Sequence, residues 1–267
     1  MHLQQAPVAQ AGRKKEKGNI RLPIFGRRNT IYAFINPYCK QKEFPPVFAL
    51  NLLPCRTGAL RSVYMTESIA VSASRESTVE RETLETKIAL HLDIDGSGKA
   101  DISTGIGFLD HMLTLFTVHG FFDLSVQAQG DTYVDDHHTA EDVGICLGQA
   151  FAQALGDKAG IHRYAHAYIP MDETLARVCL DFSNRPFLHY EVMIRDQKVG
   201  TFDTALVQEF LRALSQHAGI TLHVDLLHGE NAHHIIEAVF KALGRAMGEG
   251  ASLRQGLTGT LSSKGRL

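Results

Sequence analysis

The stretch Asp136–Glu141, which reads DHHTAE, has a second copy in Asn231–Glu237, which reads NAHHIIE. Both contain the pattern His-His-x-x-Glu, and the two patterns lie 96 residues apart. Each opens a run whose apolar residues recur with the spacing of a helix, for example Val143, Leu147 and Ala150 after the first copy. The sequence therefore predicts two similar helices, which indicates an internal duplication.

The chemistry of this pattern favours metal binding. On a helix, the first histidine and the glutamate lie at i and i+4 on one face. The second histidine is rotated by about 100° but still reaches the glutamate at i, i+3. Each copy can thus aim two imidazoles and a carboxylate in two directions, which suits two metal ions better than one. A single copy would be a weak signal, because histidine pairs at helix starts are often just solvated, whereas two copies favour metal ligation.

The segments around these helices also repeat in order. Superposing His119 on His217 places Glu209 opposite His111, so an earlier helix of each half corresponds as well. We predict helices over 109–119 and 203–217, and strands over 122–127, 165–169, 176–182, 186–194 and 221–226. The expected fold class is α+β: two mixed or antiparallel sheets, each covered on one face by two helices, with the helices packed between the halves. The two repeats are expected at about 77–160 and 161–250, followed by a C-terminal tail, 251–267.

The beginning of the first repeat gives a further prediction. Ordered chain is expected from near Ser77, and the run 79–95 alternates well enough to predict one long strand. The turn Asp95–Gly98 (DGSG) then predicts a hairpin, with 99–103 returning along that strand.

Charge is distributed unevenly along the 267 residues. Residues 1–64 hold eleven Lys and Arg against two acidic residues, whereas residues 65–267 hold sixteen against twenty-seven. An acidic body argues against nucleic acid as the main partner. No apolar run approaches the roughly 20 residues of a membrane span, so we expect a soluble protein that does not bind membranes. The four cysteines show no paired spacing, and Cys146 and Cys179 are expected to be buried thiols in a reducing compartment.

Residues 1–76 are predicted to be a poorly ordered basic extension, with the functional domain confined to 77–267. The extension is Arg-rich and acid-poor, as transit peptides are, but residues 1–64 contain a single serine, Ser62. A plainer interpretation is a segment upstream of a true start at Met65. Cytoplasmic localisation is expected, with a plastid as the alternative if the extension is a transit peptide; nuclear targeting is the weakest interpretation.

Eight side chains are candidate metal ligands. Six come from the paired motifs and two from corresponding positions on the earlier helices: His111, His137, His138, Glu141, Glu209, His233, His234 and Glu237. A nitrogen and oxygen set without thiolate suits two six-coordinate divalent ions, which favours Mn²⁺ or Fe²⁺ over structural zinc. Four cations in the otherwise acidic body, Arg163, Arg185, Lys241 and Lys264, would suit a phosphorylated small molecule, although each alone reads equally well as a surface charge.

The order of the motifs along residues 77–267 resembles the imidazoleglycerol-phosphate dehydratase family. The residues that carry this resemblance are RETLET (81–86), GFLDHML (107–113), DDHHTAED (135–142), GTFD (200–203), HHIIEA (233–238), FKA (240–242) and SSKG (262–265). Residues 1–64 match nothing in the family pattern.

The resemblance implies a lyase of histidine biosynthesis that converts imidazoleglycerol phosphate to imidazoleacetol phosphate. It further implies two Mn²⁺ ions per active site, a 24-subunit shell, and sites between subunits. Seven of the eight candidate ligands match family ligands; the eighth is usually a histidine where this chain has Glu209, and His217 is the alternative. Implied substrate contacts are Glu85, His111, His119, His137, Glu141, Arg163, Arg185, His233, Lys241, Ser262, Ser263 and Lys264.

The chemistry explains why such an enzyme needs metals. Coordination of both ring nitrogens would favour an imidazolate, which can expel the adjacent hydroxyl to give a diazafulvene. A base would then take the neighbouring proton, and Glu85 is the proposed general acid/base, with Glu237 and a metal-bound water as competitors. Two rival interpretations are a dinuclear metallohydrolase and a non-catalytic metal-storage shell. The order His-His-x-x-Glu and the intervening strands disfavour the ferritin-like form of the latter.

Overall fold

The computed structural model describes residues 74–267, all within one compact unit that spans Ser68–Leu267. Nearly all of the predicted extension, 1–76, including Met65, lies outside the described residues. Fourteen elements follow in chain order. The first half holds β1 (Glu76–Glu82), β2 (Thr86–Asp93), β3 (Ala100–Ser103), α1 (Gly107–Gly120), β4 (Asp123–Gly130) and α2 (His137–Leu155). The second holds β5 (Tyr164–Met171), β6 (Thr174–Asp181), β7 (Phe187–Glu191), β8 (Lys198–Val199), β9 (Phe202–Asp203), α3 (Leu206–Ala218), β10 (Thr221–His228) and α4 (Ala232–Ala251).

The same sheet topology occurs twice. The first sheet has the order β1-β2-β4-β3 and the second β5-β6-β10-β7. In each sheet the third strand of the half pairs in parallel at one edge, while the other neighbours are antiparallel. Two mixed sheets with matching connections confirm the predicted duplication and the α+β fold class.

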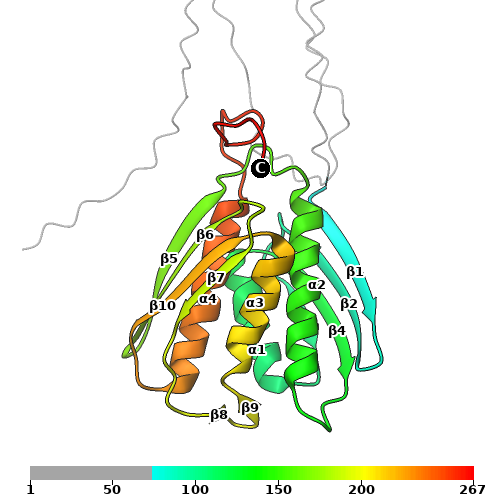
Figure 1. Ribbon diagram of the computed structural model, residues 1–267, viewed down its shortest axis with the longest axis vertical. Coiled ribbons are helices and arrows are strands. Elements are labelled where there is room, and N and C mark those ends of the chain that lie inside the picture. Colours follow the sequence, from blue (N-terminus) through cyan, green and yellow to red (C-terminus); the bar gives the residue numbers. More distant parts are fainter. Residues whose placement is uncertain (1–73) are drawn as a thin grey trace, which may run out of the picture. The chain divides into compact units, whose positions relative to one another are not determined.

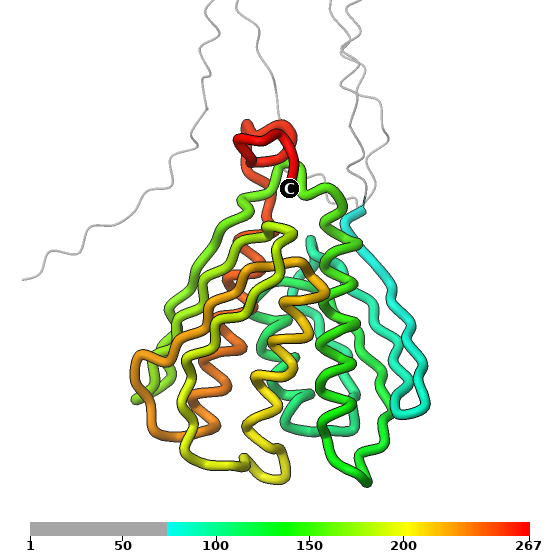
Figure 2. The backbone as a smooth tube through the Cα atoms, viewed as in Figure 1, coloured from blue at the N-terminus to red at the C-terminus, as the bar shows by residue number. Residues whose placement is uncertain are grey.

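The four helices lie between the two sheets, as Figure 1 shows and the tube in Figure 2 traces. α1 and α2 pack on the first sheet and α3 and α4 on the second, while α2 packs along α3 and α1 along α4. The inward faces of the strands are apolar, for example Ile88, Leu90 and Leu92 on β2. Because alternate strand residues point to opposite faces, this pattern directs one face of each sheet onto the helices.

Glycines allow the helices to approach closely. A Cβ atom on Gly244 of α4 would lie 2.3 Å from the backbone oxygen of Phe116 on α1. In the other helix pair, a Cβ on Gly148 of α2 would lie 2.8 Å from the backbone oxygen of Leu214 on α3. The two helix pairs therefore meet backbone to backbone, which fixes how the side chains on α1 and α4 face one another.

The prediction of one long strand over 79–95 was wrong. Thr83 interrupts it, because its hydroxyl oxygen accepts hydrogen bonds from the backbone N–H groups of Glu85 and Thr86 at 3.1 and 3.0 Å. The chain turns there, and β1 and β2 pair as a hairpin in which Val79 lies opposite Leu90. Periodicity could not predict this turn, because apolar residues alternate in both strands.

The predicted return of 99–103 as a hairpin was also wrong. β3 instead pairs in parallel with β4, with Ala100 opposite Leu124. Asp123 directs this path, because its Oδ1 accepts hydrogen bonds from the backbone N–H groups of Ser97 and Lys99 at 2.6 and 3.0 Å. The helix predicted from residue 203 begins at Leu206, after the short β8–β9 hairpin. Within residues 74–267, no helix combines the length and apolar character needed to cross a membrane.

Candidate metal centre

The second His-His-x-x-Glu pattern forms the first turns of α4. The helix starts at Asn231, whose side-chain oxygen accepts hydrogen bonds from the backbone N–H groups of His233 and His234 at 2.9 and 3.3 Å. Such a cap satisfies amide groups that have no partner inside the helix. It therefore fixes both histidines in the first turn and places Glu237 one turn further along the same face.

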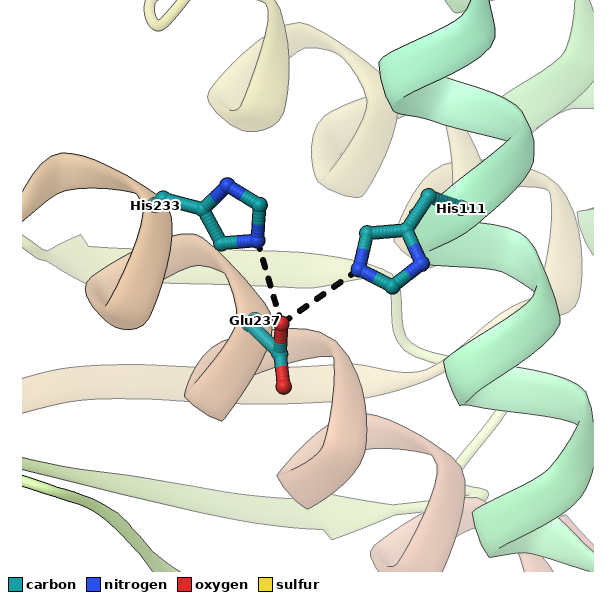
Figure 3. Close-up of side chains that lie close together, drawn as sticks. All are labelled: His111, His233 and Glu237. Carbon is teal, nitrogen blue, oxygen red and sulfur yellow. Dashed lines mark hydrogen bonds and ion pairs between the residues drawn. The ribbon is translucent and has the colours of Figure 1, made fainter.

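A histidine from another helix completes this group. Nε2 of His111 on α1 and Nε2 of His233 lie 3.3 and 3.2 Å from one carboxylate oxygen, Oε2 of Glu237 (Figure 3). One potential ligand atom from each of the three residues lies within 4.8 Å of the others. Two imidazole nitrogens and a carboxylate oxygen that converge in this way form a donor set suited to a divalent cation of intermediate softness.

Charges around Glu237 keep it ionised. Its other oxygen, Oε1, lies 2.6 Å from the ammonium of Lys241, one turn later on α4. Burial raises the pKa of this carboxyl group, but Lys241 and the two imidazoles outweigh burial, so the pKa of Glu237 is lower than usual. Glu237 is therefore a buried, anionic acceptor.

The next histidine of the motif points to a different set of partners. The His234 ring centre is 6.4 Å from that of His233, and the two planes are nearly perpendicular. Its Nδ1 lies 2.8 Å from Oε2 of Glu173 in the β5–β6 turn, while its Nε2 lies 3.8 Å from Asp172. The hydrogen bond to Glu173 raises the pKa of His234. The two imidazoles of one motif thus face in two directions, as the helical spacing predicts.

The first motif, at the start of α2, is arranged in a similar way. The backbone N–H of His137 donates to Asp135 at 2.8 Å, and its Nδ1 lies 3.9 Å from Glu141. Nδ1 of His138 lies 3.1 Å from both carboxylate oxygens of Asp131, which raises the pKa of His138. Its Nε2 lies 3.7 Å from Glu85 in the β1–β2 turn.

Glu209 occupies on α3 the position that His111 occupies on α1, because α3 packs along α2 as α1 packs along α4. Among residues 74–267 its carboxylate forms an ion pair with Arg212 and no bond to His137 or Glu141. His217, the alternative ligand, is eight residues further along α3, about 12 Å away along the helix axis, where it packs against Gly148. The position of Glu209 therefore matches the duplication better than that of His217.

Of the four predicted phosphate-binding cations, Lys241 contacts Glu237, and the other three lie elsewhere. An open cavity of about 1010 Å³ is lined by Arg163, Arg185 and the tail residues Ser262, Ser263 and Lys264. Arg163 is buried and binds Asp181 through Nε at 2.6 Å and Nη2 at 3.1 Å, while its Nη1 donates to the backbone oxygen of Leu261. Arg185 and Lys264 are exposed. Arg163 thus anchors the tail. Arg185 lies 3.6 Å from Asp181 in an exposed ion pair, and both it and Lys264 face solvent, where an anion can reach them.

This cavity and the motif histidines are at opposite ends of the helices. α2 and α4 begin at the lower end of Figure 1, and the C-terminal tail lies at the upper end. The backbone N–H of Arg163 donates to Gly250 near the end of α4, whereas His233 is in its first turn. At 1.5 Å per residue the two ends are about 25 Å apart. Within one chain, this cavity and the group of His111, His233 and Glu237 cannot contact the same small molecule.

His119, a predicted substrate contact, lies in the last turn of α1, near the end of α4, where Gly120 packs against Gly248. It borders a second cavity, of about 750 Å³, together with Arg245. Burial lowers the pKa of His119, and the nearby cations Lys241 and Arg245 lower it further. A neutral imidazole beside two cations can accept or donate a hydrogen bond without adding charge.

Two carboxylates that form hydrogen bonds with the rings of motif histidines, Asp131 and Glu173, were missed by the sequence analysis. Glu173 follows β5 as Glu85 follows β1, so the duplication could have identified it. Asp131 has no such signal, because the loop from Gly130 to His137 is longer than the corresponding loop from Gly229 to His233. Only the folded chain shows that Asp131 reaches His138.

Comparison with known proteins gives one consistent result. The family model described as imidazoleglycerol-phosphate dehydratase matches residues 104–247. The protein named imidazoleglycerol-phosphate dehydratase from Desulfotalea psychrophila is 58% identical over 199 residues, which cover 74% of this chain and 100% of the relative. The protein of the same name from Heliobacterium modesticaldum is 57% identical over 194 residues, covering 72% of this chain and 100% of the relative.

Solved structures agree. The crystal structure of imidazoleglycerol-phosphate dehydratase from Staphylococcus aureus matches with a TM-score of 0.62 and 45% sequence identity, covering 67% of this chain and 99% of that chain. The structure of the Pyrococcus furiosus enzyme in complex with (S)-C348 matches with a TM-score of 0.62 and 36% identity, covering 71% of this chain and 100% of that chain.

Proposed function

This chain belongs to the imidazoleglycerol-phosphate dehydratase family, and from that premise we propose that it performs its reaction with two divalent cations held by the paired motifs. The enzyme is a hydro-lyase of histidine biosynthesis, and its substrate is a phosphorylated imidazole. Membership in this family sets aside the metallohydrolase and the metal-storage alternatives.

The convergence of His111, His233 and Glu237 is the observation that supports metal dependence most directly. His234 points away from this group, because its ring is nearly perpendicular to that of His233. We therefore propose that a second cation is bound by His234 and the remaining histidines and carboxylates. The full proposed ligand set is His111, His137, His138, Glu141, Glu209, His233, His234 and Glu237. Imidazole and carboxylate donors without thiolate favour Mn²⁺ or Fe²⁺, and of these we propose Mn²⁺ because the family resemblance implies it. When bound, the cations would polarise the substrate's imidazole ring and lower the pKa of its N–H group.

Other residues of the chain bind and orient the substrate. Arg185 and Lys264 bind the phosphate through charge-assisted hydrogen bonds, and Arg163 holds the tail that carries Lys264 in place. Fixing the phosphate orients the reacting carbons, which lowers the entropic cost of reaction. His119 and Lys241 supply further contacts from α1 and α4.

Proton transfer is assigned to Glu85. Its carboxylate is half exposed, lies 3.7 Å from Nε2 of His138, and accepts no hydrogen bond from any residue in 74–267. Glu237, the competing candidate, is already engaged by Lys241 on one oxygen and by two imidazoles on the other. A general base needs a free lone pair within reach of the substrate. Among residues 74–267, Glu85 has the free carboxylate that this role needs, whereas both oxygens of Glu237 are engaged.

A complete site requires two copies of the chain. The phosphate-binding cavity and the His111 group lie about 25 Å apart, a distance that a small phosphorylated imidazole cannot span. A second copy that places its cavity next to this group would complete the site. We therefore propose a homo-oligomer with its active sites between subunits, and the family resemblance makes a 24-subunit shell the expected assembly.

Elemental analysis combined with an activity assay tests the metal proposal. The purified full-length protein should contain about two Mn²⁺ per chain after loading. Treatment with a chelator should abolish conversion of imidazoleglycerol phosphate to the ketone, and Mn²⁺ should restore it. Full activity in metal-free protein would refute the proposed cations while leaving the family assignment intact.

A further inference from the structure

We propose that Asp131 and Glu173 are positioning residues of the metal centre. Each carboxylate fixes the tautomer and ring orientation of one motif histidine, so that its Nε2 nitrogen faces the cation. This inference rests on the proposed metal-dependent function and adds two residues that bind no metal themselves.

The contacts are direct. Nδ1 of His138 lies 3.1 Å from both oxygens of Asp131, and Nδ1 of His234 lies 2.8 Å from Oε2 of Glu173. Both are within hydrogen-bond range for nitrogen and oxygen. In both histidines Nδ1 is the bound nitrogen, and Nε2 has no hydrogen bond to any residue of 74–267.

The direction of these bonds follows from the chemistry of the partners. An ionised carboxylate offers only acceptor sites, so Nδ1 must carry the proton and donate it. In a neutral imidazole the lone pair then belongs to Nε2. Metal-ligating histidines commonly donate their second ring N–H to a carboxylate in this way, which also orients the ring. The folded chain thus presents His138 and His234 with the ligating nitrogen already free.

The two halves achieve this with residues at different positions. Glu173 is the counterpart of Glu85, because each occupies the turn between the first two strands of its half. In the first half Asp131 binds His138, which leaves Glu85 on the Nε2 side of the ring. In the second half Gly229 is the counterpart of Gly130, because a Cβ atom on either glycine would meet the threonine that opens the second strand of its half, Thr86 or Thr174. The position of Asp131 is therefore held by Glu230, whose backbone N–H donates to Glu173. Glu173, and not the residue at the position of Asp131, contacts Nδ1 of His234.

Glu173 is also fixed along its other edge. Its Oε1 accepts hydrogen bonds from the backbone N–H groups of Glu230 and Asn231 at 3.2 and 2.9 Å. Both oxygens are therefore occupied, one by the backbone and one by His234. The same contacts link the β5–β6 turn to the start of α4, where His233 and His234 lie.

The hydrogen bonds that hold Oε1 of Glu173 allow a substitution to test the proposal. In Glu173→Gln the amide oxygen will stay on the backbone N–H groups, so the NH₂ group must face Nδ1 of His234. Nδ1 then becomes an acceptor and Nε2 carries the proton, which inverts the tautomer. We expect Mn²⁺ at one of the two sites to bind about 10- to 100-fold more weakly. Electron paramagnetic resonance of free Mn²⁺, titrated into metal-free full-length protein without substrate, measures this.

Matched variants separate orientation from charge. Asp172→Asn removes an equal charge 3.8 Å from Nε2 of the same ring and should change Mn²⁺ affinity less than about threefold. Asp131→Asn can still present an oxygen to His138, whereas Asp131→Leu cannot. The Asp131→Asn variant should therefore keep most of the Mn²⁺ affinity of the site that uses His138. The Asp131→Leu variant should bind Mn²⁺ about 10- to 100-fold more weakly at that site. Thermal unfolding of each metal-free variant checks that it is folded.

Each outcome has one meaning. Unchanged Mn²⁺ affinity in folded Glu173→Gln and Asp131→Leu overturns the positioning role, even if the wild type dehydrates its substrate normally. Equal losses in Asp172→Asn and Glu173→Gln also overturn it, because charge alone would then explain the effect. Two Mn²⁺ sites that respond as expected in a protein without dehydratase activity would support the positioning role and refute the proposed function. A wild type that binds no Mn²⁺ refutes both.

Discussion

Nε2 of His111 on α1 lies 3.3 Å from Oε2 of Glu237 on α4, although 126 residues separate them in the chain. The contact exists because the two helices cross at glycines, where their backbones nearly touch. The proposed metal group is thus a product of helix packing as much as of the motif. The predictions below follow from this arrangement and from the division of roles around it.

Glu237→Gln should remove the only carboxylate in the His111 group. It also leaves the Lys241 ammonium without its ion-pair partner in a largely buried position. Mn²⁺ content after loading and dialysis should fall by at least one ion per chain, as measured by elemental analysis. Glu249→Gln, an exposed substitution on the same helix, is the control and should retain the wild-type content. Full Mn²⁺ content in Glu237→Gln would remove Glu237 from the ligand set.

Gly244→Ala should force α1 away from α4. The new methyl group would lie 2.3 Å from the backbone oxygen of Phe116, which cannot move as a side chain can. Overpacking of this kind costs about 1–3 kcal/mol of unfolding free energy. Urea denaturation measures the loss, and Mn²⁺ affinity should fall with it because His111 shifts. Gly107→Ala, at the start of α1 with no atom near its new methyl group, should be neutral or slightly stabilising.

Glu85→Gln should reduce kcat by about 10²- to 10⁴-fold, the usual contribution of a general acid or base. Mn²⁺ content should stay near the wild-type level, because Asp131 still orients His138. Steady-state kinetics and elemental analysis of the same preparation give both values. Glu80→Gln, an exposed change on the adjacent strand, serves as the control. Normal turnover in Glu85→Gln would exclude Glu85 from proton transfer.

Mixing two inactive variants should restore activity. Arg185→Ala impairs the phosphate-binding cavity and His233→Ala impairs the metal group, and these lie at opposite ends of one chain. If each site combines parts from two copies, co-assembled variants will form some sites with both parts intact. Dehydration assays after unfolding and refolding the mixture would show this recovery. A double variant carrying both changes, refolded with either single variant, should recover nothing.

Stability should depend on Asp123 at acid pH. Hydrogen bonds from the backbone of Ser97 and Lys99 lower the pKa of this carboxyl group from 3.8 to about 2. A folded-state pKa below the unfolded value means that the ionised group favours the folded state. Its contribution is complete above about pH 4 and is lost as the pH falls toward 2. Asp123→Asn should be less stable than wild type at pH 6 in urea denaturation, and the difference should shrink as the pH approaches 2.

Much of the site could be predicted because helical spacing is local. The pattern His-His-x-x-Glu places His233 and Glu237 on one face of any helix, whatever surrounds it. The correspondence of His111 with Glu209 follows from the repeat alone. The turn at Thr83 and the parallel pairing of β3 could not be predicted in this way. They depend on backbone N–H groups that donate to the side-chain oxygens of Thr83 and Asp123, and periodicity does not record these bonds.

The duplication, the α+β class and the two motif helices were determined by the sequence itself, since repeated order and apolar period are properties of the chain. The tertiary structure alone decided which groups meet. Asp131 reaches His138, Glu173 reaches His234, and Arg163 and His233 lie at opposite ends of the helices. The physical reason is that backbone hydrogen bonding and helix crossing set distances between residues far apart in the sequence, whereas residue identity and spacing constrain only near neighbours.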